Sequence, residues 1–166
     1  DGFGMLNYFE GRCRTGQYQN RDCLYIIDRH GNEKIVLISG GGKNCDEKLI
    51  KGTTYGMAYV TEANECSPVF IKEVFDRTLS SNNRKIFHDL NPKAEGHWYY
   101  DDVLDFHEEQ QDNNPDYGYN YGHFTIADNM SVSDEKLRKE IATYDKHSIW
   151  YLRDILGKRK QAEGLV

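Results

Sequence analysis

The amino-acid sequence predicts an α/β fold, and three observations support this assignment. Residues 56–61 are an apolar run of strand length that we interpret as a buried strand. Residues 67–79 have the spacing of an amphipathic helix, and residues 85–90 are a second short β-rich run. A strand, a helix and a strand in this order imply two parallel strands. We therefore expect a sheet flanked by helices.

Composition limits the class of protein. The chain has 166 residues, of which 38% are hydrophobic and 29% charged, which is enough for one domain, or a large piece of one, with a real core. The formal net charge of −6 argues against a surface that grips phosphates everywhere, although a local basic patch remains compatible with nucleic acid. The four cysteines show no C-x-x-C pair, which indicates reduced thiols.

A β-hairpin is predicted near the N-terminus. Two β-rich runs, residues 23–28 and 33–39, are separated by the turn sequence RHGN at 29–32. The next strand, residues 56–61, follows a loop rich in glycine and lysine. We expect the hairpin strands to be antiparallel.

The helix after residue 66 has a defined start and an apolar face. Ser67 is a cap residue and Pro68 suits the first turn. Polar residues 80–83 end the helix before the strand at 85–90. The side chains expected on its buried face are Phe70, Ile71, Val74, Phe75 and Leu79.

The second half of the chain predicts three more helices and one strand. A helix over residues 97–111 carries Tyr99, Val103 and Phe106 on one face, and residues 112–116 end it. Residues 117–126 alternate aromatic with small or polar side chains, which favours a half-exposed strand. The last two helices begin at Ser133, with Leu137, Ile141 and Tyr144 inward, and at Ser148, with Gly157 as the stop.

Two apparent ligand motifs fail on their spacing. The run Gly40 to Lys43 resembles a phosphate-binding loop, but that loop needs an earlier glycine and a Ser or Thr after the lysine, where this sequence has Leu37 and Asn44. A flexible turn is the better interpretation. The six histidines lack the spacing of a zinc site, so no metal site is predicted.

Polar side chains follow both predicted parallel strands. Glu62 comes directly after residues 56–61, where a carboxylate can act as a general base beside a nucleotide, although a solvated loop acid fits the pattern as well. After the second strand, Pro92 holds Asn91 in an extended geometry that aims its amide beyond the sheet edge. The sequence therefore predicts a site at this edge.

In addition, an ordered series of segments resembles the large subunit of tailed-phage terminases, in the branch found in phages and prophages of Gram-positive bacteria. The residues AYVTEANE at 58–65 resemble the Walker B segment of that family, and DLNP at 89–92 resembles its coupling motif. The remaining matching segments are residues 30–32, 48–52, 75–77, 97–98, 123–129 and 153–157.

The resemblance implies part of a larger ATPase. Residues 1–157 would be the later part of a P-loop-NTPase-type domain, with the additional-strand, catalytic-glutamate sheet, and residues 158–166 a linker toward a nuclease domain. The P-loop is expected upstream of Asp1 and the nuclease downstream of Val166. The intact protein would use ATP and Mg²⁺, whereas this fragment is expected to bind neither and to be inactive alone.

The resemblance also implies roles for single residues. Glu62 would polarise the attacking water, Asn91 would sense the nucleotide, and Lys51 would reach a neighbouring subunit's phosphate. Thr61 stands where the family usually has an acid that binds Mg²⁺ through water, and a hydroxyl orders such a water more weakly. Glu65 is the other acid nearby, but its offset from the strand end favours Glu62.

The partners implied by the resemblance are double-stranded DNA, the portal protein, the small terminase subunit and other copies of the large subunit. No membrane is involved, and the location is the cytoplasm of the bacterial host. Two alternatives remain open. One is a non-catalytic prophage remnant or partner-binding module, and the other is a nucleic-acid binder that stacks bases on Tyr117, Tyr119 and Tyr121.

Overall fold

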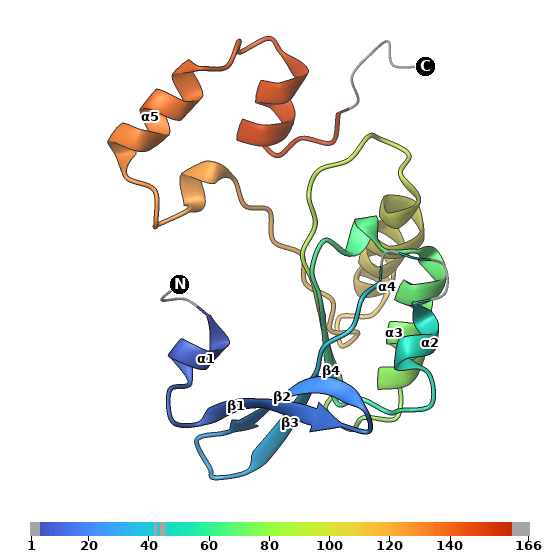
Figure 1. Ribbon diagram of the computed structural model, residues 1–166. Helices are drawn as coiled ribbons and strands as arrows, with labels where there is room; N and C mark the ends of the chain where they lie inside the picture. Colours follow the sequence, from blue (N-terminus) through green and yellow to red (C-terminus); the bar gives the residue numbers. More distant parts are fainter. Residues whose placement is uncertain (1–3, 42, 44–45, 161–166) are drawn as a thin grey trace. The chain divides into compact units, whose positions relative to one another are not determined.

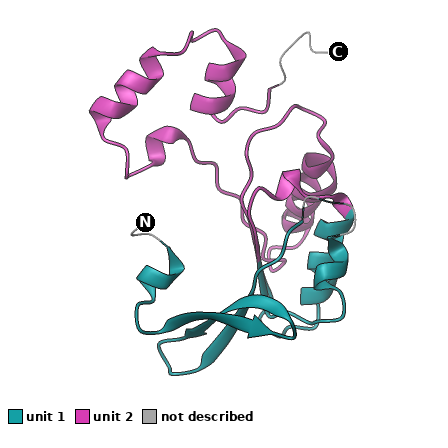
Figure 2. Ribbon diagram, viewed as in Figure 1, with its two compact units in different colours: residues 1–58, 69–85 teal, residues 59–68, 86–166 magenta. Residues whose placement is uncertain are grey.

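The computed structural model describes residues 4–41, 43 and 46–160 (Figure 1). The chain forms two compact units, each built from two stretches of sequence (Figure 2). Unit 1 comprises residues 1–58 and 69–85, and unit 2 comprises residues 59–68 and 86–166. Gly42, Asn44 and Cys45 of the glycine-rich loop, and residues 161–166 of the predicted linker, lie outside the described residues.

Unit 1 contains an antiparallel sheet in the order β1-β2-β3. Its strands are β1 (Cys13–Tyr18), β2 (Arg21–Ile27) and β3 (Glu33–Leu37), and a short helix, α1 (Met5–Tyr8), precedes them. The predicted hairpin is β2 paired with β3, with Ile27 opposite Glu33 and Cys23 opposite Leu37, and is confirmed.

Sequence reasoning did not predict β1, because a glycine interrupts it. Gly16 lies opposite Cys23, and the ring of Tyr25 covers it so closely that an added Cβ would lie 2.8 Å from a ring carbon. Glycine in a strand interior weakens that strand, but at position 16 the absence of a Cβ leaves room for the Tyr25 ring of the neighbouring strand.

Within unit 1, Arg21 of β2 forms hydrogen bonds to the segment between the three-stranded sheet and β4. Its guanidinium donates to the Leu49 carbonyl (2.6 Å), the Thr53 hydroxyl (2.7 Å) and the Tyr55 hydroxyl (2.9 Å). Leu49 belongs to the short helix α2 (Glu47–Ile50). One cation thus fixes α2 and the turn that leads to the next strand.

Helix α3 (Pro68–Thr78) confirms the helix predicted after Ser67. Its buried face includes Phe70, Ile71 and Val74, with exposed fractions of 6%, 2% and 5%. The assignment of Leu79 to this face was wrong, because the helix ends at Thr78 and the Leu79 side chain is exposed.

The predicted parallel strands are β4 (Met57–Val60) and β5 (Lys85–His88), each shorter than expected, and they form a two-stranded sheet. The Asp89 N–H donates to the Val60 carbonyl (3.1 Å), and the Asp89 carbonyl accepts from the Ala63 N–H (2.9 Å). This staggered exchange is the parallel pattern. These bonds join the parts of the two strands that belong to unit 2.

Strand β4 is not the fully buried strand that its apolar sequence indicated. Val60 is buried, but Met57 and Tyr59 are exposed by 58% and 66%. Side chains alternate between the two faces of a strand, and one face of this narrow sheet is open in the part of the chain that the structure describes.

The predicted helix at 97–111 contains a π-helix. Trp98 and Tyr99 begin it, η2 (Tyr100–Asp105) continues as π-helix, and α4 (Phe106–Asn113) completes it. Tyr99 and Val103 are buried as expected, but Phe106 is 49% exposed, so its placement on the inner face was wrong. The wider π turn changes the angle between residue 103 and residue 106.

Residues 117–126 are not a strand, contrary to prediction. The N–H groups of Gly118 and Tyr119 donate to Gln111 Oε1 at 2.9 and 2.7 Å. Gly118 also has a φ of +89°, which an extended strand excludes. The Gln111 side chain of α4 thus accepts from backbone N–H groups that would otherwise pair with a neighbouring strand.

The tyrosines of this segment do not form a row on one strand face either. The rings of Tyr117 and Tyr119 stack against His107 of α4, with centroid separations of 5.7 and 6.0 Å. Tyr121 is half exposed. The predicted stacking platform for bases therefore lacks its geometric basis.

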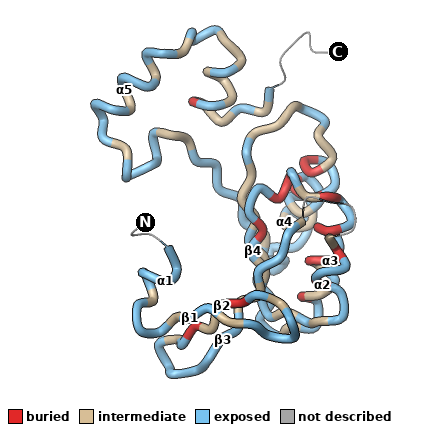
Figure 3. Tube along the Cα trace, in the orientation of Figure 1, coloured by how far each residue is buried: buried red, intermediate tan, exposed pale blue. Residues whose placement is uncertain are grey.

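The C-terminal segment contains η3 (Ile126–Asp128), α5 (Asp134–Ala142) and η4 (Tyr151–Ile155). The two predicted helices are confirmed: the Ser133 hydroxyl caps α5 by accepting from the Lys136 N–H (3.4 Å), and Gly157 follows η4 with a φ of +63°. Most residues of this segment are exposed (Figure 3). Leu137, Ile141 and Tyr144 are half-buried.

No described helix is long and apolar enough to cross a membrane. Among the described cysteines, at positions 13, 23 and 66, none forms a disulfide.

Candidate functional site

Asp89, directly after β5, is the centre of a hydrogen-bond cluster in unit 2. Its carboxylate accepts from the Glu62 N–H (2.7 Å), from the Thr61 hydroxyl (3.2 Å) and from the Tyr59 hydroxyl. These three donors belong to β4 or directly follow it. The cluster therefore ties the end of one parallel strand to the end of the other.

The charge of Asp89 follows from these contacts. Partial burial raises the pKa of this carboxyl, but the hydrogen bonds from Glu62, Tyr59 and Thr61 hold its net pKa below the ordinary value. The hydrogen bond that Tyr59 donates to Asp89 raises the pKa of the Tyr59 phenol. At neutral pH Asp89 is thus an anion that accepts, and Tyr59 is a neutral donor.

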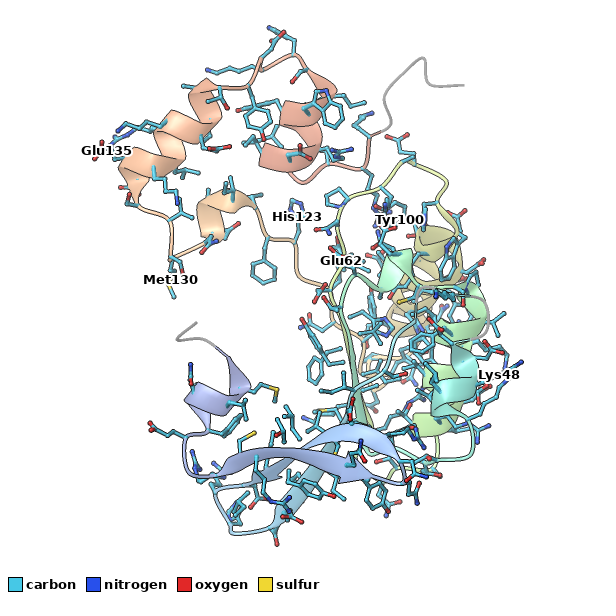
Figure 4. The ribbon with its side chains drawn as sticks, viewed as in Figure 1. Lys48, Glu62, Tyr100, His123, Met130 and Glu135 are labelled. Carbon is cyan, nitrogen blue, oxygen red and sulfur yellow. The ribbon has the colours of Figure 1, made fainter. Side chains whose placement is uncertain are left out.

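Glu62 has an uncommon backbone conformation. Its φ of 48° and ψ of 47° lie in the left-handed region, which non-glycine residues adopt only where the surroundings hold them. The Asp89 carboxylate supplies that hold through the Glu62 N–H. The turn reverses the chain directly after β4 and presents the Glu62 carboxylate at the strand end (Figure 4).

Asn91 contacts that carboxylate directly. Its Nδ2 donates to Glu62 Oε1 at 2.8 Å, and both side chains are exposed. The main chain of Asn91 is fixed in turn, because Asn64 Nδ2 donates to the Asn91 carbonyl at 2.7 Å. Asn64 is 2% exposed and lies in η1 (Ala63–Glu65). The structure thus brings together the two residues that the sequence predicted as catalytic, Glu62 and Asn91.

The second acid near the strand end is already paired. Glu65 forms an ion pair with Lys93 Nζ, which follows Asn91 by two residues. Glu65 therefore has a cationic partner, whereas the Glu62 carboxylate is contacted by the neutral amide of Asn91.

Lys51 lies in unit 1 and is not part of this cluster. Its ammonium forms an ion pair with Glu47 at 3.6 Å, one turn earlier on α2. Thr61 is within the cluster, but its hydroxyl donates to Asp89. The structure therefore groups Thr61, Glu62 and Asn91 in unit 2 and leaves Lys51 in the other unit.

His88, the last residue of β5, lies beside Asp89 but is neutral. Burial lowers the pKa of its imidazole to about 4. Nδ1 is hydrogen-bonded to the hydroxyl of Tyr99, a fully buried residue whose own pKa is raised by burial. His88 therefore anchors β5 to the helix that begins at Trp98, and it carries no charge at neutral pH.

A cavity of about 720 Å³ adjoins the Asn91 side of the cluster, within unit 2. It is lined by residues 90–94, directly after β5, by residues 124–126, and by Arg153, Asp154, Gly157 and Lys160 of the C-terminal segment. Its cationic side chains are Lys93, Arg153 and Lys160, each of which has a carboxylate partner.

The described residues do not complete a nucleotide or metal site. Within residues 4–41, 43 and 46–160, no three His, Cys, Asp or Glu side chains come together as metal ligands. The chain has no sequence of the P-loop type to hold a triphosphate. What the cluster offers is the Glu62 carboxylate, presented by a left-handed turn, and the Asn91 amide that donates to it.

Sequence reasoning missed two residues of the cluster. Asp89 and Asn64 stand in the motifs that were singled out, DLNP and TEAN, but neither was assigned a role. Their partners are 27 residues away along the chain, so no local spacing reveals the contacts. The available signal was that both polar residues flank the ends of strands expected to be parallel.

Comparison with known proteins identifies a matching family. The model of the family described as phage terminase large subunit matches residues 21–157. No curated protein sequence matches the chain.

Solved structures of the large terminase from a thermophilic bacteriophage are similar to this one. Crystal form 2 is 25% identical to this chain and has a TM-score of 0.76. The match covers 97% of this chain and 36% of the solved chain. The complex with ADP is 23% identical with a TM-score of 0.75 and the same coverage. The complex with ATP-gamma-S is 22% identical with a TM-score of 0.68, and 92% of this chain covers 34% of that chain.

The chain thus spans about a third of the length of the solved terminases that it matches. The family resemblance that the ordered motifs indicated is confirmed, over a match that includes both Glu62 and Asn91. The chain therefore belongs to the phage terminase large subunit family.

Proposed function

We propose that this chain is the water-activating part of the ATPase that drives double-stranded DNA into a phage procapsid. The observation that carries the proposal is the Glu62 carboxylate, held in a left-handed turn at the end of β4 and contacted by Asn91 at 2.8 Å. A carboxylate fixed at the end of a parallel strand is where nucleotide-hydrolysing folds place a general base. The nucleotide-bound terminases of the thermophilic phage add support by similarity of fold.

In this mechanism Glu62 orients a water and accepts its proton. The water oxygen forms a bond to the γ-phosphorus while the bond from that phosphorus to the bridging oxygen of ADP breaks. Asp89 contributes indirectly, because it holds the Glu62 main chain. Asn91 donates to the carboxylate and so registers whether Glu62 is engaged with water or with the amide.

ATP and Mg²⁺ would be held mainly by residues outside this sequence. ATP supplies the phosphoryl group and Mg²⁺ the positive charge that offsets its oxygens. In this chain Thr61 would take the place of the acid that usually binds Mg²⁺ through water. The hydrogen bond that the Thr61 hydroxyl donates to Asp89 fixes the orientation of this hydroxyl. Lys51, on unit 1, is proposed to reach the phosphate of a neighbouring subunit.

The proposed partners are double-stranded DNA, the portal protein, the small terminase subunit and other copies of the large subunit, in the cytoplasm of the bacterial host. These follow from the family to which the chain belongs. The proposal also includes a nuclease activity, carried by a domain beyond this chain.

The test is Glu62→Gln in a full-length terminase that contains this segment. We expect ATP turnover to fall by about 10²- to 10⁴-fold, because the amide cannot accept a proton, while ATP binding is retained. The matched comparison is Glu65→Gln, which removes the ion pair with Lys93 but leaves the Glu62 carboxylate in place, so it should lower turnover far less than Glu62→Gln. Wild-type turnover in the Glu62→Gln protein would remove Glu62 from the mechanism.

A second measurement concerns the chain by itself. Calorimetric titration with ATP should show no binding, because the sequence lacks a P-loop and its backbone cradle. Saturable binding would mean that other residues of this chain hold the triphosphate, and it would contradict the division of the site proposed here.

A further inference from the structure

The segment after η4 returns to η2 and contacts it through one arginine. The guanidinium carbon of Arg159 lies 4.1 Å from the centroid of the Tyr100 ring, a cation–π contact. Its Nη1 is also 3.8 Å from Asp105 Oδ1. Tyr100 and Asp105 are the first and last residues of the π-helix, and all three residues belong to unit 2.

The π-helix explains why one arginine reaches both partners. In an α-helix, residues five apart point in directions about 140° apart around the axis. In a π-helix each residue hydrogen-bonds to the fifth residue along, so Tyr100 and Asp105 come close to the same face. The unusual helix thus builds the surface on which Arg159 rests.

The hydroxyl of Tyr100 extends this contact to the loop after β5. It accepts from the Lys93 N–H at 2.6 Å and lies 3.4 Å from the Lys93 carbonyl, to which it donates. Tyr100, labelled in Figure 4, is 4% exposed, and its part-buried hydroxyl is hydrogen-bonded to the main chain of Lys93. Tyr100 therefore pins the loop at Lys93.

The pinned residue is connected to the Glu62–Asn91 pair in two ways. Pro92 lies between Asn91 and Lys93, has a fixed φ and restricts the backbone of Asn91, so a shift of Lys93 is passed to Asn91. The Lys93 side chain also pairs with Glu65, in the short helix that follows Glu62. A displacement at Lys93 would thus act on both partners of the pair.

We propose that Arg159 is a positioning residue that controls how firmly Asn91 holds Glu62, acting through Tyr100 and the main chain of Lys93. This inference rests on the proposed function, in which Glu62 and Asn91 form the hydrolytic pair. Gly157 and Lys160, which lie close to Arg159 in the sequence, line the cavity together with residues 90–94. A movement of the segment after η4 changes the support under Tyr100 and thereby the geometry at Glu62.

The first test uses hydrogen exchange of backbone amides, measured by NMR on this chain. Arg159→Ala should accelerate exchange at the Lys93 amide by about tenfold, because the tyrosine that accepts from it is released. Tyr100→Phe keeps the ring under Arg159 and removes the acceptor, so it should have the same effect. Lys160→Ala removes the neighbouring 3.0 Å ion pair with Glu95 and should leave the Lys93 amide unchanged.

Three outcomes of this test would overturn the proposal. One is unchanged exchange at Lys93 in Arg159→Ala. Another is equal acceleration at Lys93 and at Leu24 of the unit 1 sheet, which would mean general unfolding rather than release of one loop. Unchanged exchange in Tyr100→Phe would likewise break the link between the ring and Lys93.

The second test uses turnover in a full-length terminase that contains this segment. Arg159→Ala should lower kcat for ATP by about tenfold with KM for ATP unchanged, since positioning of the base is lost but nucleotide contacts are not. Arg159→Lys keeps the charge beside Asp105 without the planar stacking, so it should recover part of kcat. Unchanged kcat in Arg159→Ala would overturn the control of Glu62, whatever the exchange data show.

The two proposals fail separately. If Glu62→Gln turns over ATP at the wild-type rate, the catalytic role of Glu62 fails, while the exchange at Lys93 still reports on Arg159. If Arg159→Ala leaves the Lys93 amide unchanged, the link through Tyr100 fails, whatever the result for Glu62.

Discussion

One aspartate in each unit accepts several hydrogen bonds after the end of a strand, but the two aspartates differ in how far along the chain their donors lie. In unit 1, Asp28 follows β2, and its Oδ1 accepts from the His30 N–H (2.8 Å) and the Asn32 N–H (2.9 Å). In unit 2, Asp89 follows β5 and accepts from residues 27 to 30 positions earlier. One carboxylate closes a hairpin turn, and the other joins the ends of two parallel strands.

The difference shows how the same interaction serves stability in one place and a functional site in the other. The Asp28 hydrogen bonds form as soon as the turn forms, and they stay within the β2–β3 loop. The Asp89 contacts require the crossover through α3 to be folded first, because closing that longer loop costs entropy. In return, Asp89 holds Glu62 in a backbone conformation that no local interaction would favour.

The largest expected difference between the two regions is the loss of stability that protonation of His88, in unit 2, causes at acidic pH. The pKa of His88 is lowered to about 4 by burial, so the unfolded chain binds a proton at higher pH than the folded chain does. Stability from neutral His88 is present above about pH 6.5 and is lost as the pH falls toward 4. We expect the free energy of unfolding to drop by up to about 3 kcal/mol over this range.

Denaturant unfolding at several pH values would measure this drop. His88→Gln, which cannot take up a proton, should show a clearly smaller decrease between pH 6.5 and 4. His147→Gln, at an exposed position, is the matched control and should behave as the parent chain. An equal decrease in the His88→Gln and parent proteins would assign the acid response to other groups.

The next effect is that of removing the Asp89 carboxylate. Asp89→Ala leaves the donors of Tyr59, Thr61 and Glu62 without their common acceptor, and we expect a loss of about 1–2 kcal/mol in the free energy of unfolding. Asp89→Asn keeps an acceptor oxygen of the same shape and should lose less. Denaturant titration of the three proteins at pH 7 tests this order, and equal stability of Asp89→Ala and the parent would contradict it.

The smallest effect is expected at Asp28. Hydrogen bonds from the Asn32 N–H, the Asn32 side chain and the His30 N–H lower the pKa of this carboxyl to about 2, against partial desolvation. Its contribution to stability is present above about pH 4 and is lost as the pH falls toward 2. Asp28→Ala should destabilise the chain less than Asp89→Ala, because the turn remains local and solvated. A larger loss at Asp28 would reverse the comparison between the two regions.

Elements with local signals were predictable from the sequence. The turn at 29–32 between β-rich runs indicated the hairpin, and Ser67 followed by Pro68 indicated α3, because caps and turns depend on residues a few positions apart. Ser133 before α5 is a third case. At the site, the position of Glu62 after β4 and of Asn91 after β5 could be expected once the strands were taken as parallel.

Two elements were not predictable from the spacing of apolar residues. The segment at 117–126 has the alternation of a strand, but Gln111 binds its backbone groups, so it has no strand geometry. The π-helix at Tyr100–Asp105 leaves no mark in the spacing of apolar residues, and it moved Phe106 to the surface. In the first case the hydrogen bonds to Gln111 overrode the local preference for a strand.

The sequence by itself determined the α/β class, the hairpin, the order of the helices and the family, because these follow from short-range spacing and from ordered motifs. Only the tertiary structure decided that Asp89 holds Glu62, that Asn64 holds Asn91 and that Arg159 rests on Tyr100. Each of these contacts joins residues that are 27 or more positions apart. Such pairs meet only after the intervening chain has folded, and that is why the cluster around Glu62 could be located from the sequence but not assembled from it.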